Sequence, residues 1–209
     1  MFENFPNLKV VNFFDITIDC LKYKSKAKLL SKNYRLKSFS KLLNEEEFAK
    51  VYMAYSEKGL HFIFDVKTSF KKSFYPEIRR GDSIEIFIDT RALKTQGYLT
   101  KFCHHFVFFC ENIQGFKAKE ITRFKADDMH KLCSSSDLLV DSIIKPKNYM
   151  LDIFIPEFCL MGYNPSQIHY LAFSYRINRS QMSAQNFCSS SDEHKIEKSP
   201  HLWTKMNLK

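Results

Sequence analysis

Short runs in which hydrophobic and polar residues alternate follow one another along most of the chain. Between 83 and 91, Ile84, Ile86 and Ile88 stand two residues apart, which places them on one face of a strand, with Glu85, Asp89 and Arg91 on the opposite face. The same pattern predicts a hairpin at 49–67, turning at 56–59, and strands at 104–109, 137–145, 149–156, 169–178 and 203–208.

The turn-forming residues fall outside these runs. The five glycines and six prolines lie between the runs or at their ends, which is typical of a β-sandwich or barrel. Helix is scarce: we expect one turn beginning within 44–52 and a short turn after Pro156. We therefore predict one all-β domain spanning 1–209, an antiparallel, jelly-roll-like β-sandwich.

Composition agrees with this fold. Of the 209 residues, 44% are hydrophobic, which suffices for a substantial core. Aromatic residues make up 15%, and 21 of them are phenylalanine, a residue that packs well on pleated surfaces.

The positive charge is concentrated in one segment, 20–44. The formal net charge is +9, yet this segment alone holds eight lysines and arginines and no acidic residue. Lys22, Lys24, Lys26 and Lys28 alternate, so in a strand they would form one face able to bind phosphates. The pattern favours a solvated edge strand over a phosphate-binding one. A long excursion carrying a strand and a basic loop are further alternatives. Nucleic-acid binding through 22–41 stays open as an alternative function.

The six cysteines show no CxxC spacing, and the first residues lack the basic and apolar regions of a signal peptide. No apolar stretch approaches the roughly 20 residues of a membrane span. We expect a cytoplasmic protein with reduced, mostly buried thiols and no membrane partner.

A thiol and two imidazoles stand side by side in "KFCHHFVFF". Strand alternation places Cys103 and His105 on one face and His104 on the other. Cys103 and His105, with Asp89 from the neighbouring strand, form a candidate zinc site. The alternative is a central strand with buried, hydrogen-bonded histidines, and the surrounding phenylalanines favour it.

No catalytic motif is present. The GxSxG, P-loop, GxGxxG and HExxH patterns are absent. Glu85 and Asp89 share a strand face but stand roughly 13 Å apart by the rise per residue, beyond the about 5–9.5 Å of a glycosidase pair. We expect a protein that is not an enzyme.

The stretch "GDSIEIFIDTR" resembles a strand of family 9 carbohydrate-binding modules and the wider DOMON-like superfamily. "GLHFIFDVK", "YMLDIFIPEFCL" and "YLAFSYRIN" resemble the neighbouring strands in the same order, so the resemblance covers roughly 45–209. More narrowly, "KFCHHFVFF" and "HLWTKMNL" resemble an uncharacterised bacterial family.

This resemblance implies a β-sandwich with a concave sheet that binds a carbohydrate or other small polar ligand. Family 9 modules stack sugar ends between two tryptophans, whereas this chain has only Trp203. The candidate ligand-binding residues are Asp89, Arg91, Tyr98, His104, His105, Gln185 and Trp203. Of these, Arg91 and Gln185 would hydrogen-bond polar groups, while Tyr98 and Trp203 would offer flat apolar surface.

Haem is the other ligand that the resemblance suggests, because some DOMON relatives bind it through methionine and histidine. Here His104 or His105 would act with Met53 or Met182. We expect the protein to have no cofactor. The alternative is that it binds haem or zinc.

Overall fold

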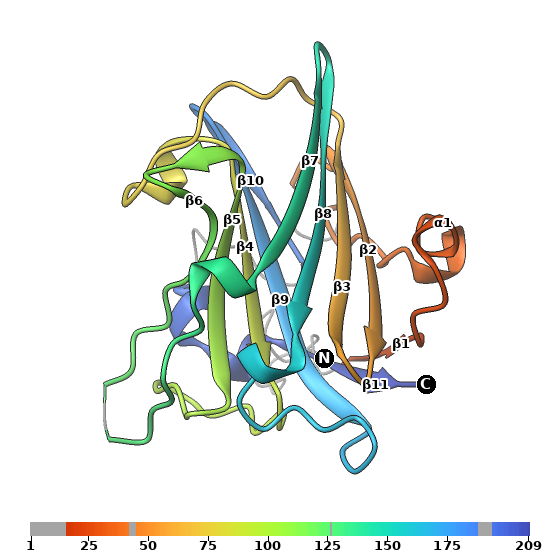
Figure 1. The fold of residues 1–209 in the computed structure, drawn as a ribbon, viewed down its shortest axis with the longest axis vertical. Coiled ribbons are helices and arrows are strands. Elements are labelled where there is room, and N and C mark those ends of the chain that lie inside the picture. The colour runs from red at the N-terminus through yellow and green to blue at the C-terminus, as the bar shows by residue number, and fades with distance from the viewer. Residues whose placement is uncertain (1–15, 42–44, 126, 188–193) are drawn as a thin grey trace, which may run out of the picture.

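The computed structural model describes residues 16–41, 45–125, 127–187 and 194–209. Two β-sheets pack face to face as two layers (Figure 1). The strands are β1 (Thr17–Cys20), β2 (Ala49–Ser56), β3 (Gly59–Val66), β4 (Ser83–Asp89), β5 (Cys103–Ile113), β6 (Phe116–Glu120), β7 (Leu139–Lys145), β8 (Asn148–Pro156), β9 (Tyr170–Arg179), β10 (Met182–Asn186) and β11 (Thr204–Leu208). Helices are short: α1 is Lys26–Leu29, and 3-10 turns cover Lys32–Tyr34, Ile78–Arg80, Ser135–Asp137, Glu157–Cys159, Ile196–Lys198 and Pro200–Leu202.

Within the described residues, one sheet has seven strands in the order β1-β11-β9-β4-β5-β6, with β10 also paired to β9, and the other has four in the order β2-β3-β8-β7. The pairings are antiparallel except that of β1 with β11. The predicted all-β, antiparallel sandwich is confirmed.

The β2–β3 hairpin forms where the sequence predicts it, with its turn between Ser56 and Gly59. Gly59 has a φ of +141°, and a Cβ there would lie 2.1 Å from the backbone oxygen of Ile155 on β8. Glycine is therefore required for both the backbone conformation and the close approach of β3 to β8.

Strand alternation also holds in β4 and β5. Ile84, Ile86 and Ile88 lie in the core between the sheets, beside Phe106 and Phe108 of β5. The opposite residues of β4 and β5 face outward from the seven-stranded sheet, where a second cluster includes Phe87, Cys103 and Trp203. As predicted, β5 is a central strand buried on both faces.

The basic segment covers the outer face of the four-stranded sheet. Leu29 and Tyr34 pack against Tyr52, Ala54 and Ile63 of β2 and β3, and α1 lies on the outer side of β2 (Figure 1).

The predicted strand face of four alternating lysines is wrong. Lys26 and Lys28 belong to α1, which Ser25 caps by accepting the N–H of Lys28. All four lysines are exposed, while Lys22 pairs with Glu57 and Lys26 with Asp152.

The helical turn predicted within 44–52 is absent from the described residues of that range. Residues 45–48 have no regular secondary structure, and the backbone N–H groups of Phe48 and Ala49 donate to the side chain of Gln185. A contact with a residue far along the chain thus overrides the local preference for helix.

The expectation of reduced thiols also needs correction, because Cys133 and Cys159 form a disulfide. Cys20, Cys103 and Cys110 are free and buried, and Cys188 lies outside the described residues. No helix in the described ranges has the length and apolar character needed to cross a membrane.

Candidate functional site

Polar residues from three neighbouring strands meet on the outer face of the seven-stranded sheet. Glu85 lies in the middle of β4, directly opposite Arg176 of β9, and Phe87 lies opposite His105 of β5. Because side chains alternate along each strand, Glu85, His105, Arg176 and Asn178 all point to the same face.

The Glu85 carboxylate accepts hydrogen bonds from all three of these neighbours. Oε1 accepts from Arg176 Nη1 and from Asn178 Nδ2, both at 2.9 Å, and Oε2 lies 2.8 Å from His105 Nε2. The Glu85 side chain has no exposed surface, and that of Arg176 is 1% exposed. A buried carboxylate is tolerated here because it is paired and fully hydrogen-bonded.

Burial alone would raise the pKa of Glu85, but the hydrogen bond from His105 and the charge of Arg176 lower this pKa to about 2. An ionised carboxylate can only accept hydrogen bonds, so His105 Nε2 carries the shared proton. The ring nitrogen left for a ligand is Nδ1. Glu85 therefore fixes both the orientation and the tautomer of His105.

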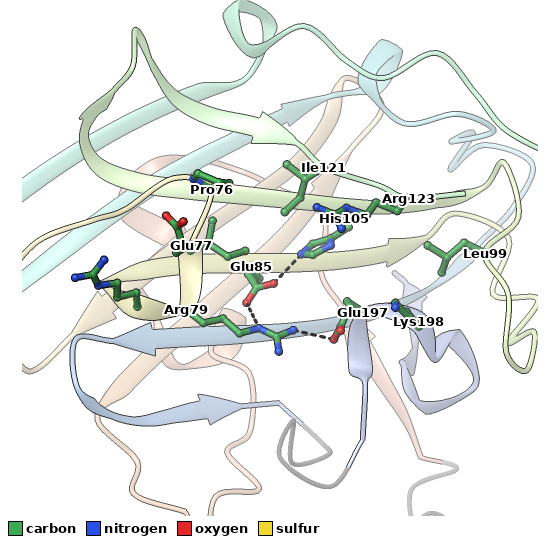
Figure 2. Close-up of a pocket in the computed structure, with 12 residues that line it drawn as sticks. Pro76, Glu77, Arg79, Glu85, Leu99, His105, Ile121, Arg123, Glu197 and Lys198 are labelled. Atoms are coloured by element: carbon green, nitrogen blue, oxygen red, sulfur yellow. Dashed lines mark hydrogen bonds and ion pairs between the residues drawn. The ribbon is translucent and has the colours of Figure 1, made fainter. Parts of the chain in front are cut away.

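A pocket of about 360 Å³ opens above this buried group, within the roughly 300–1,000 Å³ common for small-molecule sites. Figure 2 shows the Arg79 guanidinium between two carboxylates, 3.8 Å from Glu85 and 3.0 Å from Glu197. Arg123 and Lys198 also line the pocket, as do the apolar side chains of Pro76, Ile78, Leu99 and Ile121.

A smaller pocket of about 110 Å³ adjoins it. The two share Leu99, Arg123 and Lys198, and the smaller one adds the aromatic rings of Tyr98 and Phe124. Tyr98 is 52% exposed, so its ring is available to a ligand. Together the pockets offer charged groups above Glu85 and, in the smaller pocket, aromatic surface beside cationic side chains.

His105 and Tyr98 are the predicted ligand-binding residues that line these pockets. Asp89 instead closes the loop after β4, where its carboxylate accepts the backbone N–H groups of Arg91, Leu93 and Lys94. The Arg91 guanidinium lies over the ring of Phe102. Neither Asp89 nor Arg91 lines the pocket above Glu85.

The side chains of Gln185 and Trp203 are buried and stabilise the packing around the strands. The Gln185 amide links β10 to β2 and to the Tyr175 hydroxyl. Trp203 is 1% exposed, donates its Nε1–H to the Ile196 carbonyl and stacks on Phe87. Phe87 in turn contacts the His105 ring with centroids 4.5 Å apart, so Trp203 supports His105 through Phe87.

The predicted zinc set of Cys103, His105 and Asp89 is not assembled. Cys103 Sγ lies 3.6 Å from the hydroxyl of Thr100, His105 is held by Glu85, and Asp89 is occupied by backbone N–H groups. The register places Asp89 opposite Cys103, but their side-chain partners differ.

His104 points away from the pocket, toward Phe106 and the core, and contacts Glu120 and His130. Of the proposed haem ligands, Met53 is buried in the core on β2 and Met182 is exposed at the start of β10. Neither methionine is among the residues that line the pocket above Glu85.

Sequence reasoning missed the group that organises the pocket: Glu85, Arg176, Arg79 and Glu197. Strand alternation places Glu85 on one face with Asp89 but does not identify its partners. A signal was present, because Glu85 lies among isoleucines and Arg176 lies in the apolar run "YLAFSYRIN". Charged residues within two such runs suggest a buried ion pair between neighbouring strands.

No protein-family model and no curated protein sequence matches the chain. Among solved structures, a family 9 carbohydrate-binding module from Caldicellulosiruptor kristjanssonii, in complex with cellotriose, is similar with a TM-score of 0.66. It is 14% identical, and the match covers 93% of this chain and 94% of the module.

A family 9 module from the same organism in complex with glucose gives a TM-score of 0.63 at 14% identity, covering 93% of this chain and 95% of the module. A proposed carbohydrate-binding protein from Bacteroides uniformis gives a TM-score of 0.58 at 8% identity, and the match covers 93% of this chain and 98% of that protein. This chain therefore has the β-sandwich fold of family 9 carbohydrate-binding modules, as the sequence resemblance implied.

Proposed function

We propose that this protein is a non-catalytic carbohydrate-binding module that holds a small saccharide in the pocket above Glu85 and His105. The observation that carries the proposal is the buried Glu85–Arg176–His105 group at the floor of that pocket. Solved structures with the same fold contain cellotriose and glucose, which supports the choice of ligand class.

The chemistry of the lining suits sugar hydroxyls, which both donate and accept hydrogen bonds. His105 Nδ1 and the Glu197 carboxylate can accept, and the guanidinium groups of Arg79 and Arg123 can donate. Arg79 is held between Glu85 and Glu197, so its donors are oriented before a ligand arrives. Such preorganisation lowers the entropic cost of binding.

Stacking on the sugar ring would fall to Tyr98 and Phe124 in the adjoining pocket. The single tryptophan is buried and stacked on Phe87, so a pair of tryptophans around the ligand does not form. A sugar ring offers one apolar C–H face, and an exposed tyrosine can cover it. We expect the ligand to extend from the charged pocket toward Tyr98.

A glycan array followed by calorimetric titration tests this function. The wild-type protein should bind at least one class of saccharide, and Arg123→Ala should weaken that binding about tenfold or more, because Arg123 lines both pockets. The matched control is Arg35→Ala, which removes an arginine paired with Glu47 beside the four-stranded sheet. An array with no bound glycan, or equal losses in the two variants, contradicts the proposal.

A further inference from the structure

A second polar cluster lies on the opposite side of β5 from the pocket. His104 of β5, Glu120 at the end of β6 and His130 of the following loop each direct one ligand atom toward the others, and these atoms all lie within 4.8 Å of one another. Glu120 Oε1 is 2.9 Å from His104 Nδ1 and 2.8 Å from His130 Nε2. The His104 and Glu120 side chains have no exposed surface, and that of His130 is 5% exposed.

A backbone carbonyl holds the ring nitrogen of His130 that does not face the cluster. Its Nδ1 lies 2.6 Å from the carbonyl oxygen of Lys101. A carbonyl can only accept, so Nδ1 carries a proton, and in the neutral ring the lone pair is on Nε2, facing the cluster. Histidines that ligate metals are oriented in this way, with the other N–H donated to a carbonyl.

The carboxylate is oriented as well. Glu120 Oε2 accepts the backbone N–H of Cys133 at 2.7 Å, and Oε1 accepts the hydroxyl of Thr122 at 2.9 Å. Ligating carboxylates commonly have such outer hydrogen bonds, which hold them in position for the ion.

A divalent cation placed among His104 Nδ1, Glu120 Oε1 and His130 Nε2 would satisfy all three inward-facing atoms at once.

We propose that His104, Glu120 and His130 bind a divalent transition-metal ion of the zinc class. Two imidazoles and one carboxylate are a common protein ligand set for Zn²⁺, with a water molecule in the fourth position. Donor atoms in a tetrahedral zinc site are roughly 3.3 Å apart, so the two contacts of Glu120 Oε1 would open by a few tenths of an ångström, and the two histidine nitrogens already lie within 4.8 Å of each other. The site is independent of the proposed sugar pocket.

Titration of chelator-treated, tag-free protein with Co²⁺ tests this site. Co²⁺ replaces Zn²⁺ and gives visible absorption bands when its coordination is tetrahedral. We expect about one equivalent to bind, to be displaced by Zn²⁺ and to release protons. His130→Ala should weaken Co²⁺ binding at least about 100-fold, since loss of an outer-shell partner alone costs 10–100-fold. Because His130 lies in a loop outside the strands, this variant should still fold.

Two controls separate this site from adventitious binding. His169→Ala removes an exposed histidine elsewhere and should leave Co²⁺ affinity unchanged. Glu120→Gln keeps the shape of the side chain but removes its charge and should lose the visible bands. The proposal is overturned if Co²⁺ fails to bind, if His130→Ala binds as tightly as wild type, or if sulfur-to-cobalt bands show that cysteines are the ligands.

Discussion

At the scale of single residues, the floor of the pocket depends on buried charges that are fully paired. Glu85 is central, since it touches Arg176, Asn178 and His105 at once. Breaking a buried pair by neutralising one partner leaves the other charge uncompensated, which is far more costly than losing a surface pair.

We therefore predict that Glu85→Gln lowers the free energy of unfolding by about 3 kcal/mol at pH 7, the lower end of the range for such changes, because Glu197 still contacts Arg176. Denaturant unfolding measures this difference. Glu57→Gln, which removes an exposed partner of Lys22, serves as the control and should unfold like wild type.

The same carboxylate predicts how stability depends on pH. The folded pKa of Glu85 is about 2 against an ordinary value of 4.5, so its stabilisation is complete above about pH 4.5 and disappears as pH falls toward 2. Glu120 acts over the same range. Unfolding measured across this range should show a shallower loss for Glu85→Gln than for wild type, and parallel curves would refute this role.

Prediction from sequence was least complete at this scale. Alternation correctly put His104 and His105 on opposite faces, because it follows from strand geometry. The partners of these residues could not be read in the same way. Glu85 and Arg176 are 91 positions apart and meet only because β4 pairs with β9.

At the scale of elements, two segments outside the main sheets have definite structural roles. The basic segment places Leu29 and Tyr34 on the outer face of β2 and β3 while its lysines face solvent. Its lysines suggested a phosphate-binding strand, whereas its apolar residues make it a cover for the four-stranded sheet.

Leu29→Ala should therefore destabilise the protein by about 2–4 kcal/mol, because Leu29 is 1% exposed and its removal leaves a cavity. Lys28→Ala, its neighbour in α1, should leave the unfolding midpoint unchanged. Thermal or denaturant unfolding of the two variants measures the difference, and equal effects would mean that the segment does not act as a cover.

The second segment is the loop that carries His130. It is tied down by the Cys133–Cys159 disulfide and by the bond from the Cys133 N–H to Glu120. The affinity of the proposed metal site should depend on this tether, because ordering even one freed residue costs about 1–2 kcal/mol.

The double variant Cys133→Ser with Cys159→Ser should accordingly bind Co²⁺ about tenfold more weakly than wild type. Binding of saccharide in the proposed pocket, which lies on the other face of β5, should be unchanged. Equal Co²⁺ affinity in the two proteins would show that the disulfide does not position His130.

At the scale of the whole molecule, alternation and turn residues predicted most of the strands and the sandwich. β1, β6 and β10 were missed. β6 and β10 are five-residue strands, and β1 is a four-residue strand that pairs in parallel with the distant β11. Their pairing depends on sheet context more than on local pattern.

The pocket also depends on the fold of the whole molecule. It forms where the seven-stranded sheet meets the turns at 76–80 and 196–198, so its lining comes from segments that are remote in sequence. Sequence placed His105 and Tyr98 among the candidates, but the residues around them became clear only with the fold.

Calorimetric titration of one array-selected saccharide into wild type and His105→Gln tests the central claim most directly. The substituted side chain would stay polar at the pocket floor but lack the imidazole Nδ1, so we predict at least about tenfold weaker binding with unchanged folding. Equal affinity of the two proteins for the saccharide would contradict the assignment of this pocket as the sugar-binding site.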